Sequence, residues 1–377
     1  MSSSDVVIVG AGLFGLTCAN LLALNPKIRI LILEKRNHIG GNAYSYFDPD
    51  TGIEVHKYGS HLFHTSNLKV WDFVNQFTSF NNYRHVVFSV HNSQLFSMPV
   101  NLHTISQIYG QFLGPDQARA RIQEDSMIQL EVDNFESKAI SSIGKVIYQS
   151  LFKGYTQKQW QVNPQELPSS VFSRLPIRFN LDNSYFNDDF QGLPRDGYES
   201  FFNSMISNER IRLLLNTDFF DFKEKVKKQN KIIIYTGPID RYFEYKFGSL
   251  GWRTLDFEIE KLNLPDFQGT SVINYPDLDV PFTRIHEFKH LHPERSYSAS
   301  QTIIMREYSR QAGRLDEPYY PINSAEDRKK LVNYRNLQNA ETNTFFGGRL
   351  GTYLYLDMHM AIASAMNLVE NEVLPCL

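Results

Sequence analysis

The sequence contains little cysteine, with only Cys18 and Cys376 among its 377 residues. The two do not form a C-x-x-C pair, so nothing supports a redox-active disulfide, a zinc site or a secreted disulfide framework. The formal net charge is only −3, which gives no electrostatic reason to expect binding to nucleic acid or to an anionic membrane. The apolar stretch 6–24 lacks a basic leader and is interrupted by Thr17 and Asn20. We therefore expect it to form a buried strand and helix of a cytoplasmic protein.

Familiar catalytic constellations are missing as well. The sequence shows no convincing Ser/His/Asp set and no pair of carboxylates spaced for acid–base work. His286 and His290 have an i, i+4 spacing, but they lie in a strand-like segment, so we expect no metal site. Aromatic residues make up 14% of the chain, a content that suits either a pocket stacking flat rings or an aromatic core.

What the sequence does contain is a complete dinucleotide fingerprint. The β-branched run 5–9 leads into Gly10, Gly12 and Gly15 in G-x-G-x-x-G register, and a second apolar run ends in Glu34. Gly10 permits the tight turn, Gly12 lets the backbone approach a pyrophosphate, and Gly15 allows close packing of helix on strand. The helix N-terminus favours the negative phosphates, and Glu34 is placed to bind a ribose.

Two further glycine turns favour FAD over NAD. Gly40 and Gly41 follow the second strand and allow a second close backbone approach near Asn42. An ordinary β-turn is the alternative interpretation of this pair. Near the C-terminus, a glycine-rich turn at 347–351 precedes a small-residue helix, whose N-terminus would face the electron-rich edge of a flavin ring. Asp357 could also be a simple N-cap of that helix, and the two interpretations are compatible.

We predict an α/β fold, in which a Rossmann-type FAD-binding domain carries an inserted helical domain and an antiparallel β-sheet domain. Strands at 211–215 and 231–237 should return to the nucleotide domain, and short strand-like pieces are expected within 152–198. The expected domains are a discontinuous FAD-binding domain (1–66, 198–240 and 341–377), a helical insertion (67–150) and an antiparallel-sheet substrate domain (151–197 and 241–340).

An ordered set of motifs covering nearly the whole chain resembles bacterial UDP-galactopyranose mutase. The motifs are EKRNHIGGNAY from Glu34, YGSHLFHT from Tyr58, KGYTQKQW from Lys153, SRLPIRFNLDNSYF from Ser173, YTGPIDRYFEY from Tyr235, VPFTRIHEF from Val280 and GGRLGTYLYLDM from Gly347. The resemblance implies a homodimeric flavoenzyme that interconverts UDP-galactopyranose and UDP-galactofuranose, supplied with electrons by an unspecified reductant. It implies that FAD, bound non-covalently, is competent only when reduced.

The same resemblance assigns roles to individual residues. Arg174 and Arg284 should converge on the diphosphate, because the planar guanidinium binds phosphate oxygens in a bidentate manner, and they form the catalytic set together with His61. Ser60 departs from the family, where many members have proline before this histidine. The expected substrate-binding residues are Phe152, Tyr155, Thr156, Trp160, Arg174, Tyr185, Asn274, Arg284, Tyr319 and Tyr355. The expected cofactor-binding residues are Gly10, Gly12, Leu13, Phe14, Gly15, Glu34, Lys35, Gly41, Asn42, Ser60, His61, Leu62, Asp218, Phe219, Gly237, Arg349, Tyr355, Asp357, Met358 and Ala361.

The mechanism that we expect uses reduced flavin as a nucleophile rather than as a hydride carrier. Its N5 would attack the anomeric carbon and displace UDP, and the N5–C1 sugar adduct would then open and reclose through O4 as a furanose. UDP would return to C1 and expel the flavin. Two other classes of function remain open, an FAD-dependent oxidoreductase of the amine-oxidase type and a non-catalytic flavin- or nucleotide-sugar-binding protein. A preference for UDP-N-acetylgalactosamine is a third possibility within the family.

Overall fold

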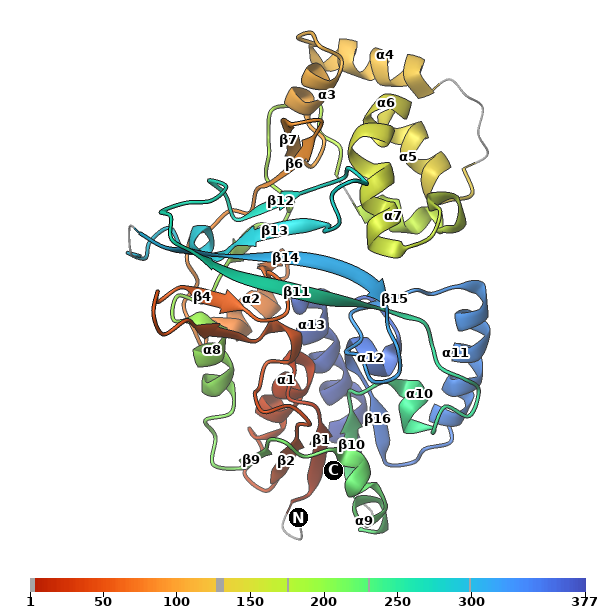
Figure 1. Cartoon of the computed structure of the whole chain (residues 1–377). Coiled ribbons are helices and arrows are strands. Elements are labelled where there is room, and N and C mark those ends of the chain that lie inside the picture. Colours follow the sequence, from red (N-terminus) through yellow and green to blue (C-terminus); the bar gives the residue numbers. More distant parts are fainter. Residues whose placement is uncertain (1–3, 127–131, 175, 230, 298–299) are drawn as a thin grey trace.

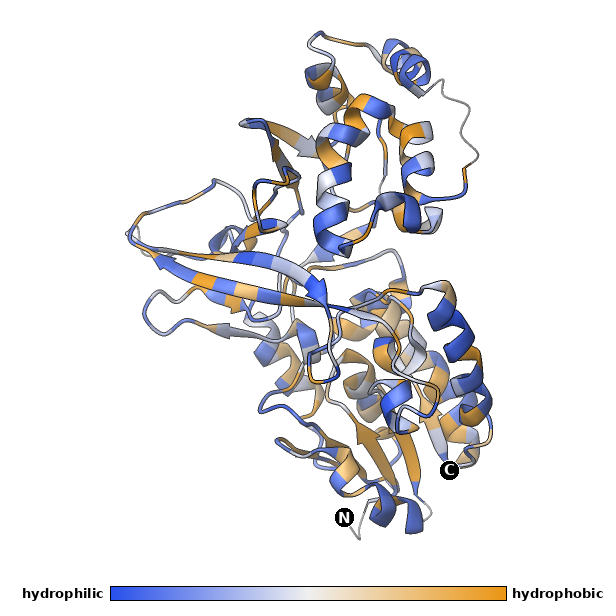
Figure 2. Cartoon of the chain, turned by 45° about the vertical axis from the view of Figure 1, so that its right-hand side comes forward, coloured by the Kyte–Doolittle hydropathy of each residue, from blue (hydrophilic) through white to orange (hydrophobic). Residues whose placement is uncertain are grey.

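A five-stranded parallel sheet forms one end of the molecule (Figure 1). The computed structural model describes residues 4–126, 132–174, 176–229, 231–297 and 300–377. The sheet has the order β16, β10, β1, β2 and β9, which span Thr344–Phe346, Ile232–Tyr235, Val6–Val9, Ile30–Leu33 and Ile211–Leu214. Every pairing in it is parallel. The strands consist mainly of apolar and β-branched residues, as is typical of a parallel sheet covered on both faces, and Figure 2 shows this apolar character.

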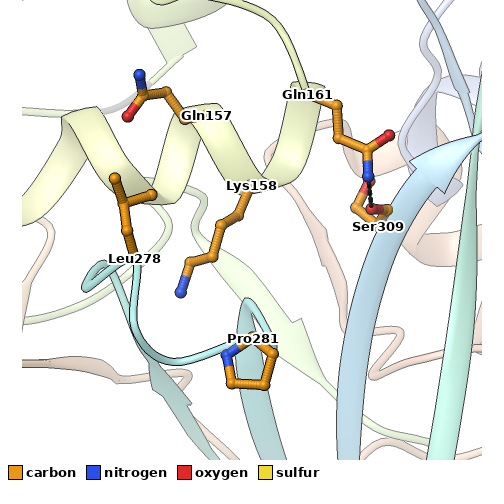
Figure 3. A pocket seen from close by; sticks show the side chains of 6 residues that line it. All are labelled: Gln157, Lys158, Gln161, Leu278, Pro281 and Ser309. Carbon is orange, nitrogen blue, oxygen red and sulfur yellow. Dashed lines mark hydrogen bonds between the residues drawn. The ribbon is translucent and has the colours of Figure 1, made fainter.

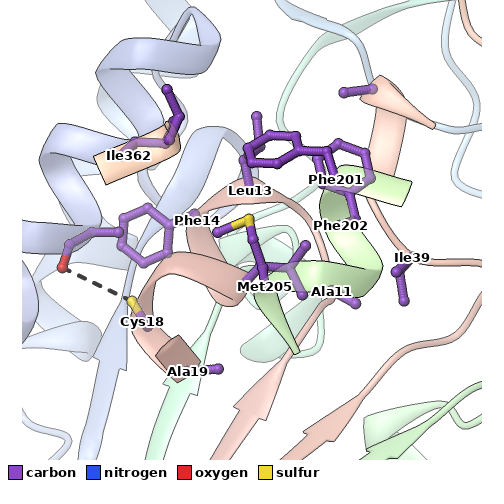
Figure 4. Packing of buried hydrophobic residues seen from close by; sticks show 14 of the residues in the cluster. Ala11, Leu13, Phe14, Cys18, Ala19, Ile39, Phe201, Phe202, Met205 and Ile362 are labelled. Carbon is purple, nitrogen blue, oxygen red and sulfur yellow. Dashed lines mark hydrogen bonds between the residues drawn. The ribbon is translucent and has the colours of Figure 1, made fainter. Parts of the chain in front are cut away.

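Helices α1 (Leu13–Leu22) and α13 (Met358–Leu368) pack together on one face of this sheet. The buried Cys18 thiol of α1 lies 4.0 Å from the main-chain oxygen of Ala365 in α13, and Ile362 and Phe14 pack in the same layer (Figure 4). Burial raises the pKa of the Cys18 thiol, so this cysteine is a packing residue. The other face is covered by η5 (Phe219–Asp221), α9 (Lys223–Lys228), α10 (Ile239–Tyr242), α11 (Ala325–Gln338) and α12 (Gly348–Thr352).

A seven-stranded sheet crosses the middle of the molecule (Figure 1). Its order is β15, β11, β14, β13, β12, β6 and β7, which span Tyr320–Pro321, Trp252–Leu262, Thr302–Gln311, Arg284–Glu287, Val272–Asn274, Val87–His91 and Gln94–Met98. All neighbours are antiparallel except β12 and β6. The expected antiparallel sheet is therefore present. Strands β6 and β7, however, lie within the range 67–150, for which the sequence indicated helices.

A helical part sits beyond β6 and β7 and has its own apolar core. It comprises α3 (Leu102–Ile108), α4 (Pro115–Ser126), α5 (Phe135–Ile143), α6 (Lys145–Ile147), η2 (Tyr148–Lys153), α7 (Gly154–Trp160), η3 (Pro164–Glu166) and η4 (Ser169–Arg174). Helix α5 begins at a reciprocal cap, in which Asn134 and Ser137 satisfy each other's main-chain N–H groups. Short strand-like pieces were expected within 152–198, and among the described residues of this range the structure has one strand, β8 (Phe190–Gly192). The first part of the range is helical instead, because the π-helical turn η2 continues directly into α7.

Shorter elements connect the three parts. Strand β3 (Ser45–Phe47) pairs with β4 (Glu54–His56), and β5 (Phe63–Thr65) pairs with β8. The remaining elements are η1 (Gly41–Ala43), α2 (Leu68–Val74), α8 (Gly197–Met205), η6 (Phe288–Leu291), η7 (Val369–Val373) and η8 (Leu374–Cys376). Among the described residues, no helix combines the length and the apolar character needed to cross a membrane.

Candidate functional site

A cavity of about 830 Å³ opens at the carboxyl edge of the parallel sheet. Three glycine turns lie around it, those after β1, β2 and β16. Most of the residues expected at the cofactor line this cavity: Gly10, Gly12, Leu13, Phe14, Gly15, Glu34, Lys35, Gly41, Asn42, His61, Asp218, Phe219, Gly237, Arg349, Asp357, Met358 and Ala361. Ser60, Leu62 and Tyr355 are not among its lining residues. The carboxyl edge of a parallel sheet is where ligands bind in folds of this kind.

The first two glycine turns face each other across the cavity. At Gly10, φ is +102°, and an added Cβ would lie 2.1 Å from Thr236 Oγ1, so this turn requires glycine. An added Cβ at Gly12 would have only Gly41 Cα near it, at 3.9 Å. Two backbones without side chains thus border one open space, as a bound pyrophosphate needs. The residues present fit a flavin dinucleotide.

Glu34 stands at the end of β2, beside the first turn. Its carboxylate accepts hydrogen bonds from the main-chain N–H of Ala11 at 2.7 Å and of Arg36 at 2.9 Å. Arg36 in turn lies over the ring of Tyr58 and pairs with Glu317 at 2.7 Å. The segment 312–318, which carries Glu317, lines the cavity but has no sequence motif, and sequence analysis did not find it.

His61 reaches the cavity as a neutral imidazole. Its Nδ1 lies 2.8 Å from the Gly59 carbonyl oxygen and can only donate there, so Nε2 carries the lone pair. Burial lowers the pKa of His61 to about 4, although the Gly59 carbonyl opposes this shift. Ser60 points the other way, and its hydroxyl lies 2.8 Å from Nδ1 of the buried His286. The serine that departs from the family pattern therefore connects the His61 loop to the large sheet.

A charged cluster lies on that sheet, next to the His61 loop. Glu307 of β14 is 2% exposed, and it contacts His286 Nε2 at 3.1 Å and Arg284 Nε at 3.4 Å. Burial would raise the pKa of this carboxyl, but Arg284 and His286 hold it at about 2. Arg284 donates a hydrogen bond to the hydroxyl of Tyr155. Burial alone would lower the pKa of Arg284, and Glu307 raises it well above its usual value, so this arginine is a permanent cation.

Sequence analysis missed Glu307, which lies between Arg306 and Tyr308 in β14. It missed Tyr320 as well, although its neighbour Tyr319 was expected at the substrate. Tyr320 stacks on Tyr355 with ring centroids 6.0 Å apart, and the Arg349 guanidinium lies 4.9 Å from the Tyr355 ring. Arg349 lines the cavity at the sheet edge. These rings thus extend from that cavity to Tyr320.

The other expected substrate residues lie on three neighbouring segments. Phe152 in η2 and Thr156 in α7 are buried, and Trp160 ends α7. The main-chain N–H of Tyr185 donates to the main-chain oxygen of His85. The rings of the two residues also pack together, with their centroids 5.2 Å apart. Asn274 ends β12 and pairs in register with Arg284. Arg174 is the last residue of η4. Its side chain lies outside the described part of the structure, so the predictions for Arg174 remain untested.

One group of metal-ligand type occurs among the described residues, away from this site. Ligand-type atoms of Asp266, Glu287 and His290 lie within 4.8 Å of one another. The Glu287 carboxylate already accepts bonds from two main-chain N–H groups and from the Thr302 hydroxyl at 2.6 Å. His290 pairs with Asp266 at 3.2 Å. The group is explained as a buried carboxylate with its ion-pair partner.

The parallel sheet, its glycine turns and the edge cavity define a Rossmann-type dinucleotide-binding domain with a second polar site beside it. A family model described as an NAD(P)-binding Rossmann-like domain matches residues 8–77, and a model for UDP-galactopyranose mutase matches residues 150–355. The chain is 43% identical to a probable UDP-galactopyranose mutase of Klebsiella pneumoniae over 372 residues, which cover 98% of this chain and 95% of that protein. It therefore belongs to the UDP-galactopyranose mutase family of isomerases, and a flavin cofactor follows from that membership.

Two further comparisons bear on fold and substrate. The chain is 39% identical to a dTDP-fucopyranose mutase of Escherichia coli over 379 residues, covering 97% of this chain and 98% of that one. A crystal structure of reduced UDP-galactopyranose mutase matches with a TM-score of 0.73 at 15% identity, over 100% of this chain and 94% of that chain. This structural likeness confirms the predicted fold class.

Proposed function

We propose that this chain interconverts UDP-galactopyranose and UDP-galactofuranose, using non-covalently bound FAD in its reduced state. FAD as the flavin, the reduced state and a homodimeric assembly are parts of this proposal. All three are supported by the family membership, and FAD is supported as well by the two-sided glycine cradle, which has room for a dinucleotide.

One observation carries the proposal: a permanent cation is connected by a short chain of contacts to the loop that reaches the flavin cavity. The contacts run from Ser60 to His286 at 2.8 Å, from His286 to Glu307 at 3.1 Å and from Glu307 to Arg284 at 3.4 Å. A nucleotide sugar whose diphosphate binds Arg284 would therefore have its sugar directed toward His61 and the flavin. An oxidase of the amine-oxidase type needs no such cation beside its flavin.

Each residue has a definite task in this reaction. Arg284 stabilises the charge that grows on the β-phosphate when the C1–O bond breaks. Glu307 fixes the guanidinium, and the hydroxyl of Tyr155 holds it from the other side. His61 presents a neutral Nε2 to the cavity and can accept a proton or a hydrogen bond there. The reduced flavin, when bound, supplies an electron-rich nitrogen for the anomeric carbon.

A second candidate substrate is dTDP-fucopyranose, since the chain is nearly as similar to the mutase for that sugar. That substrate differs by a methyl group on the base, by the loss of the 2′-hydroxyl of the ribose and by the loss of the 6-hydroxyl of the hexose. None of these three groups belongs to the diphosphate, so the Arg284 cluster serves either substrate equally well. The choice must lie in the residues around the base, the ribose and the hexose.

The test is to incubate the purified protein with each nucleotide sugar, with and without dithionite, and to separate the products by chromatography. We expect furanose product only after reduction, without stoichiometric consumption of dithionite, and more of it from UDP-galactopyranose than from dTDP-fucopyranose. Heat-denatured protein should release FAD. Equal turnover in oxidised and reduced samples would contradict the nucleophilic role of the flavin, and recovery of FMN alone would exclude FAD.

A further inference from the structure

The ammonium group of Lys158 lies close to four main-chain carbonyl oxygens, beside the residues that we expect to bind the substrate. Lys158 extends from α7 toward the loop between β12 and β13 (Figure 3). Its Nζ lies within hydrogen-bond distance of the carbonyl oxygens of four loop residues, at 2.5, 2.8, 2.8 and 2.9 Å, so these oxygens share its three N–H groups. These residues are Tyr275, Asp277, Val280 and Phe282. The loop therefore curls around one cation.

This loop carries a substrate residue at each of its ends. Asn274 is the last residue of β12, and Arg284 is the first residue of β13, two positions after Phe282. Helix α7 carries Tyr155, which accepts a hydrogen bond from Arg284. The loop and the helix are thus joined at two places, by Lys158 from the helix and by Arg284 from the strand.

The backbone contact between helix and loop is equally close. A Cβ added to Gly154, the first residue of α7, would lie only 2.2 Å from the main-chain oxygen of Pro276. On the far side, Asp277 contacts Nδ1 of His91 at 2.5 Å and accepts the main-chain N–H of Asn92. The loop is consequently held between α7 and the β6–β7 turn. Without the ammonium group, the four converging carbonyl dipoles would repel one another.

We propose that Lys158 is a positioning residue, which holds the β12–β13 loop against α7 and thereby sets Arg284 and Asn274 for the nucleotide diphosphate. This proposal rests on the proposed function. Lys158 need not touch the substrate, because its donors are used on the loop. A carbonyl cage of this kind also suits a small hard cation or a primary ammonium ion, and that property gives the inference a specific test.

The experiment measures binding of UDP to the oxidised holoenzyme by calorimetry, followed by kcat and KM after reduction. Lys158→Ala should weaken UDP binding by about tenfold or more, because buried carbonyls lose their donor, while FAD content stays near that of the wild type. Millimolar methylammonium should restore part of the affinity, whereas tetramethylammonium at equal ionic strength should not, since it has no N–H group. Lys158→Met should not respond to either ion, because the side chain fills the space.

Gln157→Ala is the matched control, since Gln157 lies one residue away and lines, together with Lys158, a separate pocket between α7 and the β12–β13 loop (Figure 3). It should leave UDP binding unchanged. If Lys158→Ala binds UDP as the wild type does, or if methylammonium restores nothing, the positioning role is wrong. Should Lys158→Ala fail to fold, Lys158→Met decides. Its side chain fills the space but has no N–H donor, so wild-type binding by that variant would overturn the inference. Failure of the wild type itself to bind UDP would instead refute the proposed function.

Discussion

Replacement of Arg284 by alanine is the most direct test of the proposed diphosphate site. The change removes the guanidinium, whose Nε lies 3.4 Å from the Glu307 carboxylate. The same group donates a hydrogen bond to the hydroxyl of Tyr155. It leaves Glu307, 2% exposed, with His286 and Thr283 as its remaining partners. Both catalysis and stability should therefore respond, and the two effects can be separated.

The structure allows the size of each effect to be worked out. Loss of one charge-assisted donor at a developing oxyanion typically costs about a hundredfold in rate, or about 2.7 kcal/mol. Removing one partner of a buried ion pair typically costs about 3–5 kcal/mol of stability. That range is an upper bound here, because His286 Nε2 still contacts Glu307 at 3.1 Å. Arg284→Lys should recover the stability better than the rate, since a point charge cannot reproduce the planar fork.

The assay compares kcat and KM with reduced enzyme, flavin content by absorbance and unfolding by urea. Turnover by Arg284→Ala should fall more than UDP affinity, because part of the interaction exists only in the transition state. Arg306→Ala is the control, as Arg306 lies opposite Ile285 on the neighbouring strand and pairs with the partly exposed Glu260 at 2.8 Å. Near-normal turnover by Arg284→Ala with full flavin content would show that the diphosphate binds elsewhere.

Two further predictions concern the cofactor cradle and acid stability. Gly12→Ala should fold normally, since its Cβ meets only Gly41 Cα at 3.9 Å, but it should lose FAD because that Cβ enters the space that the pyrophosphate needs. Gly10→Ala should unfold, because its Cβ would lie 2.1 Å from Thr236 Oγ1. Full flavin content in Gly12→Ala would disprove the cradle. Glu287, whose pKa falls from 4.5 to about 2, should contribute about 3 kcal/mol of stability above pH 4.5 that is lost as pH falls through 2. Glu287→Gln should therefore flatten the acid side of a urea-unfolding profile, and an unchanged slope would contradict this assignment.

The sequence predicted the nucleotide domain well because its signals are local. Three glycines in fixed register, an apolar run before them and an acid after the next strand are all read within 30 residues. Gly10, Gly12 and Glu34 all line the cavity at the sheet edge. The cradle's shape follows from the same signals, since both glycine turns directly follow strands.

The parts that sequence could not predict depend on distant packing. The segment from Phe152 to Trp160 is rich in aromatics, and its apolar residues follow neither the helical nor the strand period clearly. Only the structure shows that η2 continues into α7 there. Glu307 occupies an inward position of β14, where a charged residue is ordinarily unfavourable. Its partners Arg284 and His286 lie on another strand, so no sequence pattern near Glu307 predicts the charged cluster.

The electrostatics of the site explain why no acid–base constellation was visible in the sequence. Burial lowers the pKa of His61 to about 4 and the pKa of His85 to about 3, and it lowers that of His286 as well. These imidazoles are neutral at pH 7, while Arg284 remains charged because Glu307 stabilises it. The permanent positive charge beside the neutral histidines therefore resides on an arginine. Such a site is suited to stabilising a leaving diphosphate, as the proposed function requires.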